Sequence, residues 1–185
     1  MNKIIILGIF LIFSLKMNSQ NSLSSEIILK TQDTLIGEIL TAKNPFDKEF
    51  IHVTSFNNKL VFHDKLGQKR KIKAQEILEL NFTDLKGEKR RFVGIPEMKH
   101  YIVEVIYINK IKWYKHYYTN YGTETFTYMI FDQDNNRFNI GLFNSARKKL
   151  KEITQQNPDI NTFIEENKMN EENILNVIKM YEATL

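Results

Sequence analysis

Between residues 20 and 143, apolar residues tend to alternate with polar ones in short runs. This two-residue period is typical of strands that bury one face and expose the other. Such runs occupy residues 27–29, 35–40, 50–56, 60–62, 77–82, 91–95, 101–111, 113–118, 125–131 and 137–143. Because consecutive strands usually pair, we expect roughly nine or ten strands in an antiparallel β meander or a partly open barrel.

Turn-forming residues separate the runs at several points. Gln32-Asp33 and Asn57-Asn58 are short polar pairs, and residues 66–68 and 84–87 each contain a glycine. Asparagine and glycine tolerate the positive φ angles that tight hairpin turns require, so we predict turns at these positions. The run at 101–111 is apolar on both faces, which indicates a central strand.

After Phe143 the apolar period becomes that of amphipathic helices. Three apolar stripes follow one another: Ala146, Leu150 and Ile153; Ile160, Phe163 and Ile164; Ile174, Leu175, Ile178 and Tyr181. Each stripe is preceded by residues that favour the N-cap position: Asn144 or Ser145, Asn157 with Pro158 after it, and Asn170. Helices this short do not bury a stripe alone, so we expect them to pack on the sheet or on a partner.

These patterns predict an α+β protein with antiparallel strands and about three C-terminal helices packed on them. The chain has 185 residues, which suits one compact domain. We assign residues 20–143 to a β-rich body and residues 144–185 to a helical C-terminal segment of the same domain.

Residues 1–19 have the pattern of a cleavable signal peptide. Lys3 precedes an apolar run at 4–15, and a polar stretch closes the segment. A helix of that run would span about 18 Å, against roughly 30 Å for a bilayer core, which favours cleavage over an uncleaved anchor or a core helix. Ser19 is the small residue best suited to the position immediately before the cleavage site. We expect a periplasmic or secreted protein with no transmembrane segment after signal removal.

The absence of cysteine excludes disulfides, thiolate metal sites, a cysteine nucleophile and a lipid-modified cysteine. The formal charge of +4 is unevenly distributed, since residues 65–115 hold 13 Lys and Arg against six Asp and Glu. Two clusters are prominent, at residues 69–71 and 89–91. For an exported protein this favours anionic lipid or wall polymer over nucleic acid. The alternative is that these cations protect exposed strand edges from aggregation.

Residues 110–121 interleave basic and aromatic side chains. Such a strand could stack sugars or bases while its cations meet phosphate or carboxylate. The candidate ligand or partner surface is Lys112, Trp113, Tyr114, Lys115, Tyr117 and Tyr118. The alternative interpretation is an amphipathic strand that buries its aromatic residues and exposes its lysines.

Motifs for catalysis are missing: there is no Gly-rich phosphate loop, no Gly-x-Ser-x-Gly turn and no paired-carboxylate signature. His52 and His63 could meet across the turn at Asn57, but no carboxylate is spaced to complete a metal site. Residues 132–136 alternate Asp and Asn as calcium loops do, yet lack the required glycine and bidentate glutamate, and so predict a turn. We expect a non-enzymatic protein without cofactor or metal.

The order of features resembles a family of exported, uncharacterised Bacteroidota proteins. The similar segments are an opening strand at 33–39, a basic strand at 71–77, a central strand pair at 101–118, and helical segments at 150–164 and 174–181. Asn157-Pro158 stands where many members have Cys-Pro. The resemblance implies location and architecture, and it supplies no catalytic residues.

The sequence thus favours an exported cell-envelope protein that binds another envelope protein. The alternative is a peripheral binder of anionic glycan or lipid through the basic and aromatic strand surface. A protein partner would require a contiguous apolar patch, which we expect on the helical segment.

Overall fold

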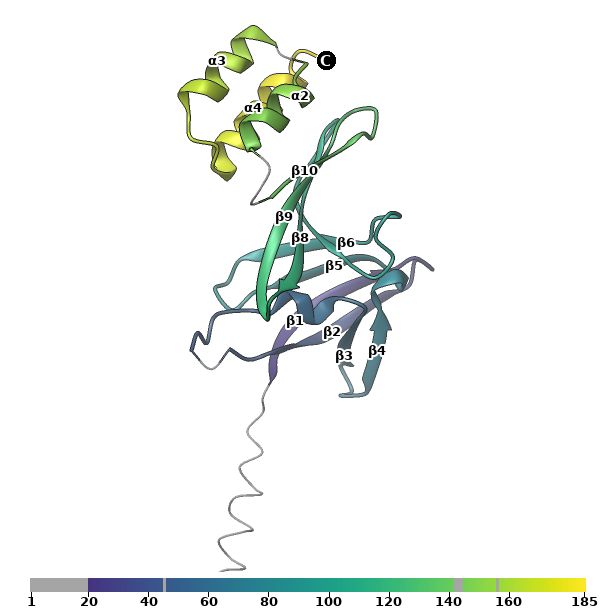
Figure 1. Cartoon of the computed structure of the whole chain (residues 1–185). Coiled ribbons are helices and arrows are strands. Elements are labelled where there is room, and N and C mark those ends of the chain that lie inside the picture. Colours follow the sequence, from purple (N-terminus) through teal and green to yellow (C-terminus); the bar gives the residue numbers. More distant parts are fainter. Residues whose placement is uncertain (1–19, 45, 142–144, 156) are drawn as a thin grey trace, which may run out of the picture.

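The computed structural model describes residues 20–44, 46–141, 145–155 and 157–185. Figure 1 shows a sheet with helices gathered at one end. The strands are β1 (Gln20–Leu29), β2 (Thr34–Ala42), β3 (Lys59–Asp64), β4 (Lys69–Lys73), β5 (Ile77–Thr83), β6 (Lys89–Val93), β7 (Val103–Ile108), β8 (Lys112–Asn120), β9 (Thr123–Phe131) and β10 (Arg137–Ile140). The helices are α2 (Ala146–Ile153), α3 (Pro158–Glu166) and α4 (Glu171–Glu182), with 3₁₀ turns η1 (Val53–Phe56) and η2 (Ala74–Glu76). The predicted signal peptide at 1–19 and the boundary at 143/144 lie outside the described residues.

All ten strands belong to one antiparallel sheet in the order β10-β9-β8-β7-β6-β5-β1-β2-β3-β4. The predicted α+β class and the three C-terminal helices are therefore confirmed. Strands β10 and β4 end the order, so the sheet is open. The sequential meander breaks once, because β5 pairs with β1 and not with β4. That pairing sets Leu80 opposite Ile27, and both are fully buried.

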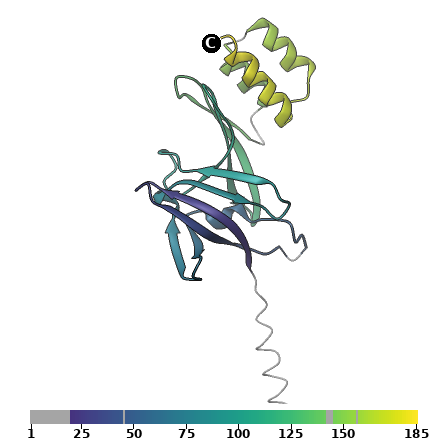
Figure 2. The same cartoon turned by 180° about the vertical axis from the view of Figure 1, so that it is seen from behind.

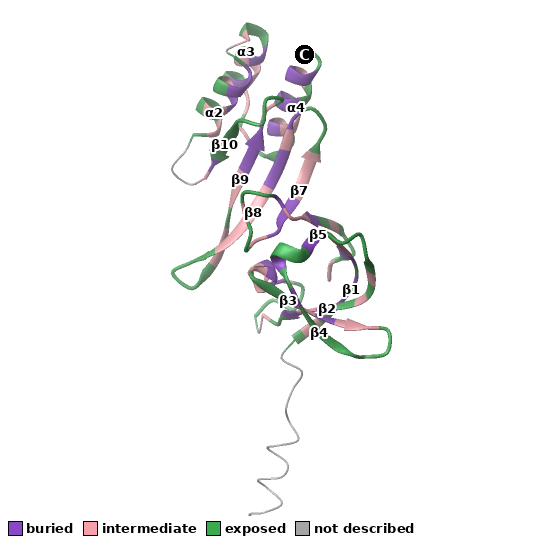
Figure 3. Ribbon diagram, turned by 90° about the vertical axis from the view of Figure 1, so that its right-hand side faces the viewer, coloured by how far each residue is buried: buried purple, intermediate pink, exposed green. Residues whose placement is uncertain are grey.

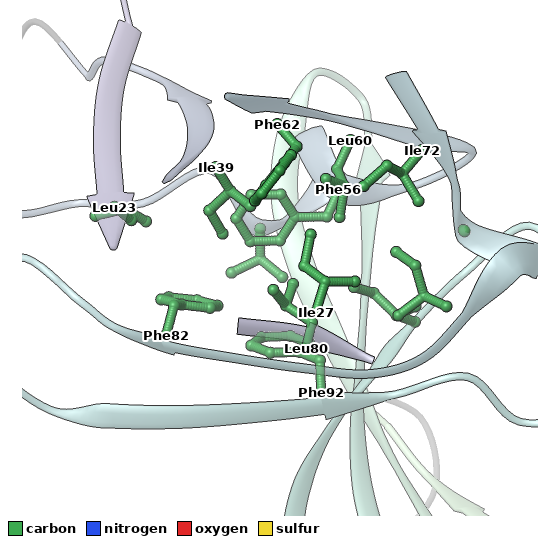
Figure 4. Close-up of a cluster of buried hydrophobic side chains, with 14 of the residues drawn as sticks. Leu23, Ile27, Ile39, Phe56, Leu60, Phe62, Ile72, Leu80, Phe82 and Phe92 are labelled. Atoms are coloured by element: carbon green, nitrogen blue, oxygen red, sulfur yellow. The ribbon is translucent and has the colours of Figure 1, made fainter. Parts of the chain in front are cut away.

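The first core lies inside the curved half of the sheet formed by β1 to β6. It holds Phe56, Phe62 and Phe92, and Figure 4 shows Phe56 in the middle of the cluster. The rings of Phe82 and Phe92 lie 5.7 and 6.2 Å from that of Phe56.

The prediction of a strand at 50–56 is wrong, because residues 53–56 form the turn η1. A 3₁₀ turn brings residues three apart to the same side. It therefore buries Val53 and Phe56 together, which a strand would place on opposite faces. Thr54 and Ser55, on the polar side of the turn, are half-buried.

The second core lies between the helices and β7 to β10, so the helices pack on the sheet. Trp113 and Ile130 contribute from the strands, Ile111 from the turn between β7 and β8, and Leu150 and Ile178 from the helices. Figure 3 shows buried residues on α3 and α4 and on the adjoining parts of β8 and β9. Viewed from behind in Figure 2, the helices again lie at the end of the sheet away from β1 to β4.

The helix starts follow the predicted caps. The side chains of Ser145, Asn157 and Asn170 accept hydrogen bonds from backbone N–H groups in the first turns of α2, α3 and α4. Of the two residues predicted for the first cap, Ser145 takes the position. No helix in the described part of the chain is long and apolar enough to cross a membrane.

Three hairpins share one turn design, led by Asp64, Asp84 and Asp132. In each, a carboxylate oxygen accepts hydrogen bonds from the backbone N–H groups two and four residues later, at 2.8–3.0 Å. The residue three positions after the aspartate has positive φ: Gly67, Gly87 or Asn135. The predicted turn at 132–136 is confirmed, since Asp132 bonds to its own loop.

Replacing Asp84 by alanine should destabilise the fold by about 1 kcal/mol, because two backbone donors lose their acceptor. Urea denaturation measures the difference in the free energy of unfolding. Asp84→Asn keeps an acceptor oxygen and should recover most of the loss. Equal losses in the two variants would show that charge, and not this turn geometry, is what matters.

Candidate functional site

Strand β8 divides the predicted basic and aromatic surface between the two faces of the sheet. Side chains alternate along a strand, so Trp113, Lys115 and Tyr117 share one face, and Tyr114 and Tyr118 share the other. Trp113 is 0% exposed and Tyr114 is 5% exposed. These two rings lie in cores on opposite faces and do not reach a ligand in solution.

Lys115 connects strand β8 to helix α4 through an ion pair. Its Nζ lies 2.8 Å from a carboxylate oxygen of Glu171 and 4.7 Å from the ring centre of Phe126. The Tyr128 hydroxyl donates to the same carboxylate. Burial alone would raise the pKa of Glu171, but the hydrogen bonds from Lys115 and Tyr128 outweigh it and the pKa is lowered. Burial, then the hydrogen bond to Glu171, raises the pKa of Tyr128.

Arg90, Glu104 and Tyr117 form a closed triangle of hydrogen bonds. Arg90 donates from Nε and Nη2 to the two oxygens of Glu104, at 2.6 and 2.8 Å. Arg90 Nη2 also donates to the Tyr117 hydroxyl at 2.9 Å, and that hydroxyl donates to Glu104 at 2.7 Å. The guanidinium carbon of Arg90 lies 5.2 Å from the ring centre of Phe92. This triangle is the most enclosed ion pair among the described residues.

The pKa shifts in the triangle follow from burial and pairing. Burial alone would lower the pKa of Arg90, but the hydrogen bonds and charge of Glu104 raise it overall. Burial and then the negative charge of Glu104 raise the pKa of Tyr117 far above its ordinary value. Arg90 and Tyr117 therefore keep their protons at any ordinary pH.

A cleft of about 390 Å³ opens beside this triangle. Its inner carboxylates already have donors: Glu104 is held by Arg90, Glu171 by Lys115, and Glu124 by the backbone and side chain of Thr54 at 2.8 and 2.7 Å. These bonds join β6 to β7, β8 to the helix α4, and β9 to η1. The arrangement cross-links strands of the sheet to a helix and to η1.

No three His, Asp or Glu side chains among the described residues converge on a possible metal position. His63 lies on β3, but His52 precedes η1 and is not in a strand. The hairpin across which these two histidines could have met is therefore not formed.

The two basic clusters of the sequence differ in their surroundings. In the cluster at 89–91, Arg90 is paired with Glu104, and Arg91 Nη2 lies 2.7 Å from Glu79. Burial alone would raise the pKa of Glu79, but its hydrogen bonds from Arg91 and Asn81 lower it. In the cluster at 69–71, only Arg70 has a carboxylate nearby, Asp64 at 3.7 Å.

We call residues 59–73, which form β3, β4 and their turn, the basic hairpin. It contains six Lys and Arg and one Asp, a charge of +5 that exceeds the +4 of the whole chain. Five of its lysines are exposed and none has an ion-pair partner among the described residues: Lys59, Lys65, Lys69, Lys71 and Lys73. The turn also exposes Leu66, at 84%.

Strand pairing concentrates this charge. Lys59 lies directly opposite Lys73. Like charges directly opposite each other in a sheet are destabilising. The register places Lys69, Lys71 and Lys73 on the face opposite to buried Ile72. The pattern of the sequence did not predict that Lys59 and Lys73 share one surface, although the lysines two apart along residues 69–73 were a signal for Lys73.

The remaining predicted surface residues lie elsewhere. Lys112 Nζ donates to Asn135 Oδ1 at 2.9 Å, on the β9–β10 turn. Tyr118 is partly exposed and stacks with His116 at 5.8 Å. The six predicted residues thus lie in five separate environments: Lys112 at the β9–β10 turn, Trp113 and Tyr114 in different cores, Lys115 and Tyr117 at the charged cleft, and Tyr118 on the other face of β8. Comparison of the chain with known protein families, characterised proteins and solved structures finds no match.

Proposed function

We propose that this protein is a non-enzymatic protein of the cell envelope that attaches to an anionic surface through the basic hairpin. The observation that carries the proposal is the group of five exposed lysines without ion-pair partners among the described residues. A surface rich in phosphate or carboxylate would neutralise the unfavourable Lys59–Lys73 neighbours. The signal-like pattern at 1–19 and the resemblance to exported proteins support the location.

Binding to another envelope protein, the other interpretation, receives less support from the geometry. That interpretation expected an apolar patch on the helical segment. The apolar stripes of α2 to α4 face the sheet instead. Among the described residues from 145 onward, the large apolar side chain that stays well exposed is Leu185, at 41%.

The test is binding of the purified protein to three anionic probes: vesicles of phosphatidylcholine with phosphatidylglycerol, lipopolysaccharide, and teichoic acid. The variant Lys69→Gln, Lys71→Gln, Lys73→Gln should weaken binding about 100-fold, since each lysine near an anionic surface contributes about 1 kcal/mol. Binding should also weaken steeply between low and high salt. The probe that binds most tightly distinguishes lipid from polymer.

The matched control is Lys148→Gln, Lys168→Gln, Lys179→Gln, which removes the same charge from exposed positions of the helical segment. It should change affinity less than threefold. Equal losses of affinity in the two triple variants would show that binding depends on net charge and not on the basic hairpin. Salt-independent binding, or no binding to any probe, would overturn the proposal.

A further inference from the structure

A second concave site lies on the other face of β8, where Tyr101 and Tyr118 meet the turn η1. It has a volume of about 560 Å³, and its lining includes His52, Asn57, Asn58, Tyr101, Tyr118 and Thr119. We call it the tyrosine pocket. None of the residues that line it is a lysine, arginine, aspartate or glutamate. This sets it apart from the charged cleft and from the basic hairpin.

The aromatic side of the pocket is a row of three rings. The ring of Tyr101 meets that of His116 edge to face at 5.0 Å, and His116 stacks with Tyr118 at 5.8 Å. Burial, with a smaller contribution from the positive charge of Arg137, lowers the pKa of His116, so the imidazole is neutral at neutral pH. The two tyrosines that border it are partly exposed. The row is held rigidly by strand β8, which supplies two of its rings.

The polar side of the pocket has free hydrogen-bonding groups. In the described part of the chain, no hydrogen bond occupies the side chains of Asn58, Thr119, Tyr101 or Tyr118. Asn57 donates from Nδ2 to the carbonyl oxygen of residue 117 at 3.2 Å, which fixes the amide and leaves its oxygen as an acceptor. The pocket thus offers both donors and acceptors from uncharged amides and hydroxyls.

The row of aromatic rings and the uncharged polar groups together favour some classes of ligand over others. A nucleotide or an anionic lipid would require cations, and the lining has no lysine or arginine. A fatty ligand would leave the amides and hydroxyls buried without partners, which is unfavourable. A pyranose ring has one flat face of C–H groups, which packs on an aromatic ring, and hydroxyl groups around its edge, which bond to amides and hydroxyls.

We propose that the tyrosine pocket binds a neutral saccharide, with the ring of Tyr118 under the sugar and Asn58 at its hydroxyl groups. The proposal goes beyond attachment through the basic hairpin and is independent of it. An envelope protein with both sites would attach to a charged surface and recognise an uncharged sugar unit next to it.

The experiment measures calorimetric binding of the purified protein to maltotriose, cellotriose, xylotriose, mannotriose and N,N′,N″-triacetylchitotriose, with trigalacturonic acid as the acidic comparator. At least one neutral trisaccharide should bind saturably and more tightly than the acidic one. Tyr118→Ala should weaken that binding about tenfold or more, because it removes the stacking ring. Asn58 has a φ of 61°, a conformation that glycine adopts freely, so Asn58→Gly removes the amide without backbone strain and should also weaken binding.

Tyr121→Ala is the control, since Tyr121 is fully exposed at the tip of the β8–β9 hairpin and is not one of the residues that line the pocket. It should bind the sugar as the unchanged protein does. The triple lysine variant of the basic hairpin should bind the sugar normally, and Tyr118→Ala should bind anionic probes normally, so the two proposals fail separately. Preference for the acidic sugar, binding by none of the neutral sugars, or unchanged binding in both Tyr118→Ala and Asn58→Gly would overturn the inference.

Discussion

Replacing Glu104 by glutamine is expected to destabilise the protein by about 3–5 kcal/mol, because it leaves the enclosed Arg90 charge without a counter-ion. The side chains of Arg90 and Glu104 are 16% and 12% exposed, and Glu104 accepts three hydrogen bonds. Glutamine keeps the shape of the side chain, but its amide nitrogen presents donors toward the guanidinium. Urea denaturation, followed by circular dichroism, measures the difference.

The second arm of this prediction separates the ion pair from the packing around it. Arg90 also lies over the rings of Phe82, Phe92 and Tyr117 at 5.2–5.9 Å. The double variant Arg90→Met, Glu104→Leu removes both charges and keeps apolar volume, so it should recover most of the stability. A loss below about 1 kcal/mol in Glu104→Gln would show that water screens the pair and that it is not a structural cross-link.

Replacing Glu182 by alanine should detach the end of α4 from the sheet, at a cost of about 3 kcal/mol or more. The Glu182 carboxylate is 9% exposed and accepts from the Tyr107 hydroxyl at 2.6 Å, the Ile111 backbone N–H at 2.7 Å and Asn109 Nδ2 at 3.1 Å. The hydrogen bond to Glu182 raises the pKa of Tyr107, so its hydroxyl stays a donor. Alanine leaves three donors without an acceptor. The Ile111 N–H is buried, Tyr107 is half-buried and Asn109 is exposed, so the main losses, typically about 1–3 kcal/mol each, fall on the first two.

Hydrogen exchange shows which part of the protein loses stability in Glu182→Ala. The amides of α4 and of the β7–β8 turn should exchange faster in Glu182→Ala, while those of β1 and β5 should keep their protection. Tyr107→Phe removes one donor only, and should cost about 1 kcal/mol. Uniform acceleration across the sheet would contradict a local role for Glu182.

The local elements of this fold were predictable because short-range chemistry determines them. Asn157 and Asn170 cap their helices with their own side chains, and Asp132 closes its turn with its own carboxylate. Such contacts span two to four residues, so the amino-acid types alone indicate them. The alternation of apolar and polar residues likewise predicted most of the strands, since burial of one face requires it.

Among the predicted strands, the one that does not form is the segment at 50–56. Its alternating residues fit a strand, yet two of them serve the first core better from the turn η1. The choice depends on the shape of the cavity that Phe56 fills between β3 and β6. That cavity is formed by residues far away in sequence, so a local pattern does not contain the information.

The candidate site shows the same division. The sequence alone located the lysines, the tyrosines and the absence of cysteine, and it separated a strand-rich body from three helices. Only the tertiary structure decided which of these lysine and tyrosine side chains face solvent. The return of β5 to β1 left β4 as an edge with its lysines exposed, and the helices covered Trp113. Burial and pairing of charges depend on contacts between distant strands, which composition and period do not encode.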